Sequence, residues 1–402
     1  MRSDVPVGAY LSGGVDSSMV VALMSKLAPD RVETFSIGFG TERDELKTAR
    51  ETAKIFNTRH HEMTVGKRDF EHLPKILWHL DEPLGDAIII PTFQLSEEAS
   101  RHVKVVLSGE GADEVWGGYV HHLAIRSSET LRKWPIPASL LRWTGARVSR
   151  MPQRWANRLF PYPGTLGNRG KEILGEWIGA VPNASSRAEY RLLASVFRSA
   201  EKEQLYTADF RQTLNAAKDP WETLDGSGLD SVMRWDMENW LPDYTLLKQD
   251  KLGLAHSVEV RVPHLDHRLV ELSARSPVSQ KIFGLTTKRV LRKAAARLLQ
   301  PEISRRPKQA FLFPYEKVFG DPFDDYVRDL LGSDRCKQRG IFSSAYLQKR
   351  LQKIRGTELL ESKQLFALLV LEIWFRVFVD GEETGESSSY SEACGRATGG
   401  GR

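Results

Sequence analysis

The sequence has few cysteines and no long hydrophobic run. Its two cysteines, Cys336 and Cys394, lie far apart without Cys-x-x-Cys or histidine spacing, so they indicate neither a disulfide framework nor a zinc site. The longest unbroken apolar runs, residues 19–24 and 366–371, are far shorter than the ~18 residues that cross a bilayer. No charged-then-apolar leader pattern opens the chain. We therefore expect a cytoplasmic protein without a membrane segment.

A strong charge of one sign is also missing. The 402 residues carry 57 Lys and Arg against 52 Asp and Glu, which gives a net charge of +5, and 41% of them are hydrophobic. This composition is typical of a folded globular chain and excludes a disordered or collagen-like one. So small a basic excess permits anionic small-molecule ligands but supplies no basic extension for RNA or DNA. We expect no nucleic-acid partner.

Strands and helices alternate over the first third of the chain. Four apolar, β-rich runs predict strands at residues 5–11, 32–39, 60–65 and 103–107. Helical patterns cover residues 18–27, 41–56, 70–80 and 92–99, and Thr41 is the expected cap of the second helix. This alternation predicts an α/β fold, in which a parallel sheet has helices on both faces and binds ligands at the carboxyl ends of its strands.

After about Tyr119 the pattern becomes mostly helical. Helices are expected at residues 187–202, 229–241, 288–299 and 364–379. Arg, Trp and Pro between residues 132 and 163, and Gly and Asn between 164 and 186, predict irregular surface segments. The glycine-rich segment 381–402 predicts a disordered tail. We therefore expect an α/β core over 1–125 and a mostly helical C-terminal half over 126–380.

A glycine and serine loop joins the first predicted strand to the first helix. It reads Ser-Gly-Gly-Val-Asp-Ser-Ser over residues 12–18. Its two glycines let backbone amides approach an anion, its serines offer hydroxyl donors, and the helix N-terminus adds positive dipole charge. These features predict a phosphate cradle. Asp16 would repel bare phosphate, which suggests that a Mg²⁺ ion lies between them.

A second motif follows the predicted strand at residues 103–107. Residues 108–119 read SGEGADEVWGGY, with four glycines and three acids. At the carboxyl end of a strand, these residues place bare backbone and carboxylates where a parallel sheet binds ligands. Clustered carboxylates repel one another unless a cation or a substrate amine balances them.

Together the two motifs resemble those of a known enzyme family. The loop at 12–18 is similar to the SGGxDS pyrophosphate loop of the ATP pyrophosphatase (PP-loop) superfamily. Residues 108–119 resemble the SGEGxDExxxGY motif of glutamine-hydrolysing asparagine synthetases and of their β-lactam synthetase and lasso-peptide cyclase relatives. Further segments agree in order and spacing at residues 35–39, 81–83, 90–92, 243–266 and 305–311. The likeness covers residues 5–379 and implies one synthetase domain over 1–380, of HUP-like, adenine nucleotide alpha hydrolase type.

The resemblance implies a role for each matching residue. ATP and its pyrophosphate would be bound by Leu11, Ser12, Gly13, Gly14, Asp16, Ser17, Ser18, Ile37, Ser108 and Gly109. Asp16 and Asp113 would carry Mg²⁺. Lys308 would neutralise charge that builds on the α phosphate during adenylation. Glu110 would organise the intermediate and the incoming ammonia, which must lose protons as it attacks.

The implied reaction is that of an asparagine synthase. ATP adenylates the side-chain carboxylate of L-aspartate, and ammonia then displaces AMP. A related amidotransferase or cyclase acting on another carboxylate, such as a sugar acid, a peptide or a β-lactam precursor, stays open. Lys251 and Leu254 stand where the family usually has Arg and Met, and Ala87-Ile88-Ile89 replaces common hydroxyl residues. A non-catalytic nucleotide-binding subunit is the alternative of another class, against which Asp16, Glu110 and Lys308 are all present.

The phosphate loop begins only eleven residues from Met1. We therefore expect that the sequence starts inside a longer protein and that the family's N-terminal glutaminase domain is absent from it. The ammonia would be free or would come from a separate or upstream glutaminase, and a homodimer stays open. His60-His61 and His121-His122 are interpreted as strand-edge and surface histidines, because no acidic or cysteine partner lies at metal-ligand spacing. Glu259 and Arg261 are interpreted as a structural ion pair on a helix.

Overall fold

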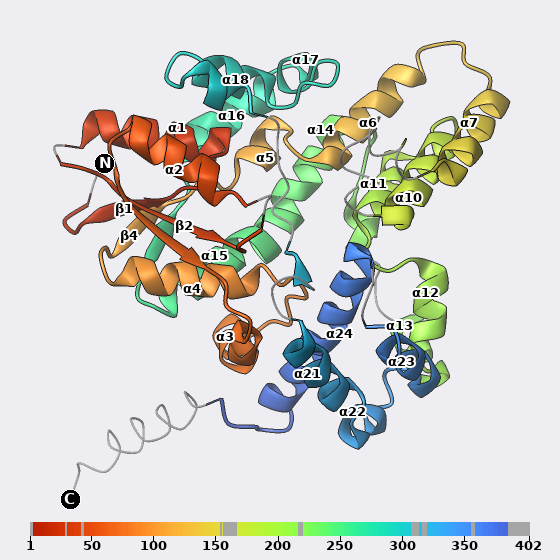
Figure 1. Ribbon diagram of the computed structural model, residues 1–402. Helices are drawn as coiled ribbons and strands as arrows, with labels where there is room; N and C mark the ends of the chain where they lie inside the picture. The colour runs from red at the N-terminus through yellow and green to blue at the C-terminus, as the bar shows by residue number, and fades with distance from the viewer. Residues whose placement is uncertain are drawn as a thin grey trace, which may run out of the picture.

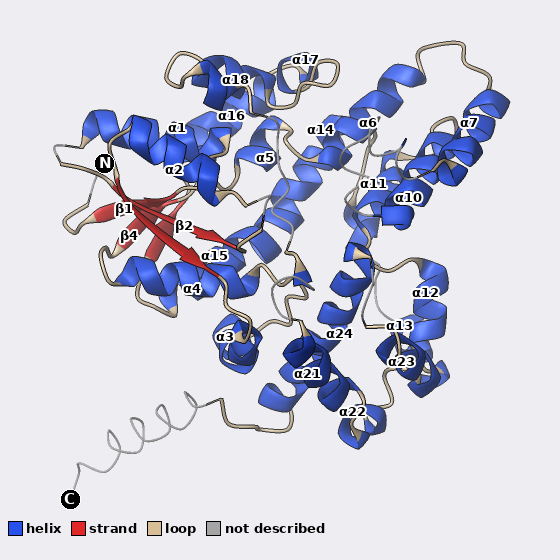
Figure 2. Cartoon of the chain, viewed as in Figure 1, coloured by secondary structure: helices blue, strands red, loops and turns tan. Residues whose placement is uncertain are grey.

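The protein is built around one parallel sheet. The computed structural model describes residues 3–28, 30–41, 44–152, 155, 167–215, 220–306, 313–315, 320–354 and 358–384. Its five strands are all parallel, in the order β3-β2-β1-β4-β5, and are drawn red in Figure 2. Ala9 on the central strand β1 pairs with Thr34 on β2 and with Leu107 on β4. The strands are β1 (Val7–Tyr10), β2 (Glu33–Gly38), β3 (Arg59–Thr64), β4 (Val105–Leu107) and β5 (Glu259–Arg261).

Helices cover both faces of the sheet, as expected. Helices α1 (Val15–Leu27) and α2 (Leu46–Ile55) pack on one face, and α4 (Ile89–Ser100) and α15 (Leu247–Leu254) pack on the other (Figure 1). Successive residues of β1 enter opposite cores because side chains alternate along a strand. Ala9 packs with α1 and α2, whereas Tyr10 packs with Ala99 of α4. The predicted α/β fold with a mostly helical second half is confirmed.

Most of the remaining helices lie beside the sheet, whereas α18 and α19 pack on α1. The largest hydrophobic core joins α24, the long C-terminal helix, to α3 of the α/β part. The other helical elements are η1 (Asp69–His72), α3 (Leu73–Leu80), α5 (Ala112–Trp116), α6 (Val120–Leu131), α7 (Ala138–Arg150), α10 (Gly167–Ala180), α11 (Ser186–Ala194), α12 (Ser199–Leu205), α13 (Ala208–Asn215), η2 (Pro220–Thr223), α14 (Leu229–Trp235), the π-helical η3 (Asp236–Leu246), η4 (Pro263–Leu265), α16 (His267–Arg275), α17 (Val278–Lys281), α18 (Arg289–Ala295), α19 (Pro301–Ser304), α21 (Asp321–Leu331), α22 (Asp334–Gln338), α23 (Ser344–Leu351) and α24 (Leu359–Phe378).

The expectation of irregular segments between residues 132 and 186 is wrong for residues 138–150 and 167–180, which are helical, while residues 153–154 and 156–166 lie outside the described residues. This region contains α7 and α10, which pack side by side at the edge of the molecule (Figure 1). Glycine is the physical reason. A Cβ added to Gly145 would lie 2.3 Å from the Gly175 carbonyl oxygen, and one added to Gly175 would lie 2.5 Å from the Gly145 oxygen. These glycines therefore allow close helix packing, whereas the sequence pattern suggested loops.

Other expectations need correction. Thr41 is not the cap of the second helix, because α2 begins only at Leu46. Asp44 lies between them and accepts hydrogen bonds from the backbone N–H groups of Phe39 and Gly40 at 2.8 and 2.9 Å. Strand β5 was not expected, because its three residues carry no apolar run.

The interpretations of the Glu259–Arg261 pair and of the histidine pairs are partly wrong as well. Glu259 and Arg261 do form an ion pair, at 2.7 Å, but on β5 and not on a helix. His60 and His61 lie on β3, an edge strand, as expected. His122 is fully buried and is not a surface residue.

Two further expectations concern the C-terminal tail and membrane-spanning helices. The expected disordered tail falls almost wholly outside the described residues, which end at 384. In the part of the chain that the structure describes, no helix combines the length and apolar character that crossing a membrane would require.

Candidate functional site

Three strands end at the same edge of the sheet, and the predicted site residues follow them. Leu11 comes directly after β1, Ile37 lies near the end of β2, and Ser108 comes directly after β4. All three are buried, and the Leu11 carbonyl accepts a hydrogen bond from the Ser36 hydroxyl. A Cβ added to Gly109 would lie 2.8 Å from the Ser17 nitrogen, so the two predicted loops are in backbone contact.

The loop at residues 12–18 is held in a tight turn before α1. Gly13 has a φ of +75°, and a Cβ there would lie 2.5 Å from the Thr48 carbonyl carbon, so glycine is required. The hydroxyl oxygens of Ser12 and Ser17 are 3.0 Å apart. Helix α1 begins after Gly14, and none of the described side chains caps its N-terminus. This leaves the first turn of the helix able to bind an anion.

Arg306 braces this loop from outside. It donates hydrogen bonds to the Gly13 carbonyl at 2.8 Å and to the Thr48 carbonyl at 3.2 Å, and it pairs with Glu51 at 2.8 Å. The loop is thereby tied both to α2 and to the segment that carries Lys308. Lys308 itself lies outside the described residues, so its predicted place at the site stays a prediction.

Asp16 and Asp113 converge as predicted, but a lysine lies between them. The Lys288 Nζ atom is 2.6 Å from Asp16 Oδ2 and 2.8 Å from Asp113 Oδ1, and its side chain is 1% exposed. Sequence reasoning missed this residue. The only signal was the clustering of carboxylates in the two motifs, which demands a cation.

The backbone at this lysine is shaped for the contact. Lys288 has a φ of +52°, a left-handed conformation that is uncommon for a residue with a side chain. A Cβ added to Gly118 would lie 2.1 Å from Lys288 Cε and 1.9 Å from Asp113 Oδ1. Gly118, at the end of the second motif, therefore leaves the space through which the lysine reaches both acids.

The donor set here suits a divalent cation as well. Asp16 Oδ1 is buried and has no hydrogen-bond partner within the described parts of the chain, while Oδ2 binds Lys288. Two carboxylates and one ammonium leave a net charge of about −1 at the edge of the phosphate loop. This charge attracts a metal ion and repels unaccompanied phosphate.

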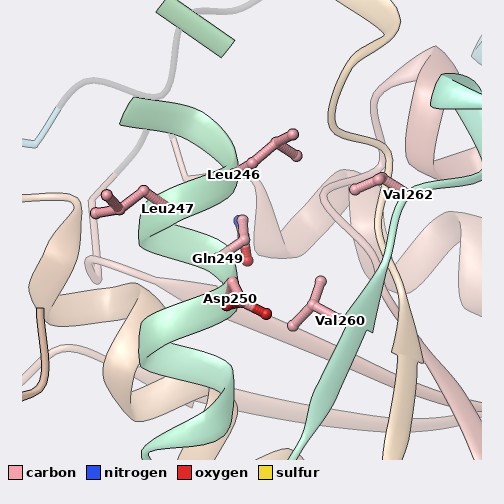
Figure 3. Close-up of a pocket in the computed structure, with 6 residues that line it drawn as sticks. All are labelled: Leu246, Leu247, Gln249, Asp250, Val260 and Val262. Carbon is pink, nitrogen blue, oxygen red and sulfur yellow. The ribbon is translucent and has the colours of Figure 1, made fainter. Parts of the chain in front are cut away.

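Glu110 faces the other side of the site. The Gln249 side-chain amide of α15 donates a hydrogen bond to Glu110 Oε1 at 3.3 Å. Gln249 also lines a hollow of about 310 Å³ between α15 and β5 (Figure 3). The lining combines polar and apolar side chains and comprises Leu246, Leu247, Gln249, Asp250, Val260 and Val262. The hollow adjoins Glu110 and is a candidate place for a second substrate.

The residues that depart from the family pattern lie in different settings, and of these Leu254 is exposed and Ile88 is partly buried. Lys251 forms an ion pair with Asp81, and Ala87 and Ile89 are buried. Asp86, just before them, accepts a hydrogen bond from the Tyr244 hydroxyl at 2.9 Å.

Glu114 is the most perturbed carboxyl of the second motif. Its side chain is fully buried, and Tyr119 donates a hydrogen bond to its Oε1 at 2.6 Å. Burial raises the pKa of Glu114 to about 7, and the charges of Asp113 and Glu110 act in the same direction. The hydrogen bond from Tyr119 opposes the shift but does not cancel it. Glu114 therefore titrates near neutral pH.

We predict that this carboxyl makes stability fall as pH rises from about 4.5 to 7. In this range the folded protein keeps the proton on Glu114, whereas the unfolded chain has lost it. Raising the pH therefore favours the unfolded state and lowers the free energy of unfolding. A Glu114→Gln variant should remove this dependence and gain roughly 2–3 kcal/mol relative to the parent at pH 8. Urea unfolding of both proteins between pH 5 and 8 measures the difference. Glu203→Gln, at an exposed position, is the control; equal pH slopes for the parent and Glu114→Gln would contradict the assignment.

Comparison with known proteins agrees with these motifs. A family model described as asparagine synthase matches residues 1–376. Asparagine synthetase (glutamine-hydrolyzing) 1 of Bacillus subtilis strain 168 is 30% identical over 385 residues, which are 94% of this chain and 57% of that protein. Amidase chry2 of Gibberella zeae is 26% identical over 385 residues, which cover 85% of this chain and 54% of its own.

The matches cover most of this chain but only part of each relative. Asparagine synthetase (glutamine-hydrolyzing) 3 of Bacillus subtilis is 26% identical over 94% of this chain and 57% of its own length. The chain thus spans little more than half the length of these curated relatives. The family match nevertheless extends over nearly all of the sequence, and the chain belongs to the asparagine synthase family.

Proposed function

We propose that this chain is an ATP-dependent, carbon–nitrogen bond-forming ligase. One observation carries the proposal. The phosphate loop and the Glu110 loop touch through Gly109 and Ser17 at one edge of the sheet, so a nucleotide and an acyl group would meet there. Parallel α/β sheets bind ligands at this edge. The asparagine synthase family match supports the same assignment.

The reaction would proceed in two steps. A substrate carboxylate oxygen attacks the α phosphorus of ATP, the bond to the bridging oxygen of the β phosphate breaks, and pyrophosphate leaves. The nitrogen of ammonia then bonds to the acyl carbon, the acyl–oxygen bond breaks, AMP leaves, and the nitrogen loses a proton. Splitting the reaction in this way replaces a very poor leaving group with AMP.

The residues divide these tasks by position. Ser12, Ser17 and the backbone at Gly13-Gly14 would hold the pyrophosphate, with Leu11, Ile37, Ser108 and Gly109 toward the nucleoside. Asp16 and Asp113 would hold Mg²⁺, which neutralises phosphate charge when it is bound. Lys288 would hold both carboxylates in place. Lys308 would stabilise charge at the α phosphate, and Glu110 would orient ammonia and receive its proton.

L-aspartate is the acceptor that we propose first, because the curated relative matched over 94% of the chain is an asparagine synthetase. The leucine and valine side chains that share the lining of this hollow with Gln249 and Asp250 support a second candidate, a larger or less polar carboxylate. Relatives named amidases match this family region too. We also propose that the nitrogen comes from ammonia, which is either free or delivered by a glutaminase.

Pyrophosphate release tests the reaction and the acceptor together. We expect continuous, multiple-turnover release from ATP and Mg²⁺ only when ammonium and a suitable carboxylate are both supplied, with L-aspartate giving asparagine, because the first step alone releases at most one pyrophosphate per enzyme. A panel of sugar acids, peptides and apolar carboxylates forms the second arm. Release that is independent of aspartate but depends on another acid would reassign the acceptor. No carboxylate-dependent release at all would refute the ligase.

Two substitutions test the proposed catalytic groups. Glu110→Gln and Lys308→Ala should each reduce amide formation by about 100-fold or more, because proton transfer and charge neutralisation are lost. Circular dichroism should show an unchanged fold, and Glu203→Gln should retain full activity as the matched carboxyl control. A variant that turns over as fast as the parent would remove its residue from the mechanism.

The Lys288 bridge has a separate test that does not need turnover. Lys288→Met leaves two neighbouring carboxylates without their cation and should lower the free energy of unfolding by about 3–5 kcal/mol. Millimolar Mg²⁺ should restore part of this loss while stabilising the parent less. The control is Lys281→Met, since Lys281 is also buried but pairs at 3.1 Å with the exposed Asp230 alone. An identical Mg²⁺ response in both variants would contradict a divalent site at Asp16 and Asp113.

A further inference from the structure

Two histidines converge on one buried carboxylate outside the nucleotide loops. His121 Nε2 lies 2.9 Å and His122 Nε2 lies 2.6 Å from the same Asp236 oxygen, Oδ2. The other oxygen, Oδ1, accepts a hydrogen bond from the Tyr190 hydroxyl. The histidines belong to α6, Asp236 begins η3, and Tyr190 lies on α11. The proposed ligase chemistry uses none of these side chains.

The cluster has the donor set of a transition-metal site. Its three ligand atoms, two imidazole nitrogens and one carboxylate oxygen, all lie within 4.8 Å of one another. Two histidines and one carboxylate bind Zn²⁺ and similar divalent ions in many proteins. Asp236, more than a hundred residues away in sequence, is the acidic partner that sequence spacing did not reveal.

Charge also favours a cation at this position. The side chains of His122 and Asp236 are both 0% exposed. Asp236 has no lysine or arginine ion pair among the residues that the structure describes. A buried carboxylate without a cation is costly.

The surroundings hold the ligands in place. The Tyr190 hydroxyl fixes Asp236 Oδ1, so Oδ2 is turned toward the histidines. The Tyr119 ring stacks on His121 with centroids 5.0 Å apart and planes inclined by 23°. Outer contacts of this kind orient ligands and raise metal affinity. The His121 side chain is 18% exposed, which gives an ion a route in from solvent.

A second group, Glu33, His61 and His102, has similar donors but a poorer setting. Arg59 pairs with Glu33 at 3.1 Å, and its guanidinium would repel a metal ion. The rings of His61 and His102 already contact each other, with centroids 4.0 Å apart and planes inclined by 33°. We therefore favour the buried cluster and use the sheet-edge group as a comparison.

We propose that His121, His122 and Asp236 bind one divalent transition-metal ion, of the zinc class, which links α6 to η3. Tyr119, two residues before His121, closes the second motif and contacts Glu114. An ion here would fix the start of α6 beside Gly118. It would thereby also hold the backbone that lies against Lys288 and Asp113. The proposal rests on the geometry of this cluster and does not depend on the ligase reaction.

The test measures binding of Co²⁺ and Zn²⁺ by the full chain after chelator treatment and dialysis. With millimolar Mg²⁺ present to fill the site proposed at Asp16 and Asp113, we expect one equivalent of Co²⁺ with visible d–d absorption, displaced by one equivalent of Zn²⁺, and a higher unfolding temperature with the transition metal. His121→Gln, at the partly exposed ligand, should lower the affinity by at least about 100-fold. Tyr190→Phe keeps the ring, removes the hydroxyl that orients Asp236, and should lower affinity by about 10–100-fold.

Two matched variants separate this site from adventitious binding. His267→Gln removes an exposed histidine and His61→Gln removes the sheet-edge donor, and both should bind like the parent. The proposal is overturned if the parent binds no Co²⁺, if His61→Gln abolishes binding, or if His121→Gln and Tyr190→Phe both bind as tightly as the parent. Tyr190→Phe provides the answer by itself if His121→Gln fails to fold.

Discussion

The ammonium of Lys288, held between Asp16 and Asp113, is the contact on which the arrangement of the candidate site depends. Asp16 belongs to the phosphate loop, Asp113 to the second motif, and Lys288 lies 272 residues after Asp16. One buried cation thus joins three distant segments, and removing it would leave two carboxylates close together with nothing to balance them. The helical half of the protein completes the α/β site through this contact.

Glycines make that contact possible by allowing the backbones to approach. Gly13 allows the phosphate loop to contact α2, Gly109 allows the second loop to contact α1, and Gly118 leaves room for the Lys288 side chain. At each position an added Cβ would lie within 3 Å of a neighbouring atom. The glycines that look like turn signals in the sequence are therefore also packing residues. The same holds for Gly145 and Gly175, which bring α7 and α10 together.

The site combines two kinds of ionisable group. Glu110 is partly exposed and bonds to Gln249, which lines the hollow, whereas Glu114 is buried and its pKa is raised to about 7. We propose that the first meets a substrate, and the second lies among Tyr119, Asp113 and the start of α6. Next to them the cluster of His121, His122 and Asp236 adds a buried carboxylate that has its own need for positive charge. Charge balance, more than apolar packing, thus organises this part of the molecule.

Local sequence determined what depends on neighbouring residues. The alternation of apolar runs predicted the α/β sheet, and two short motifs located Ser12–Ser18 and Ser108–Tyr119 at the ends of strands. Contacts between distant segments carry no local signal, so only the tertiary structure revealed Lys288 between the two acids and Asp236 beside the histidines. It also decided that the Gly-rich region after residue 164 is helical and that β5 completes the sheet. The physical reason is that burial, charge balance and close packing are properties of neighbours in space, which the spacing along the chain does not record.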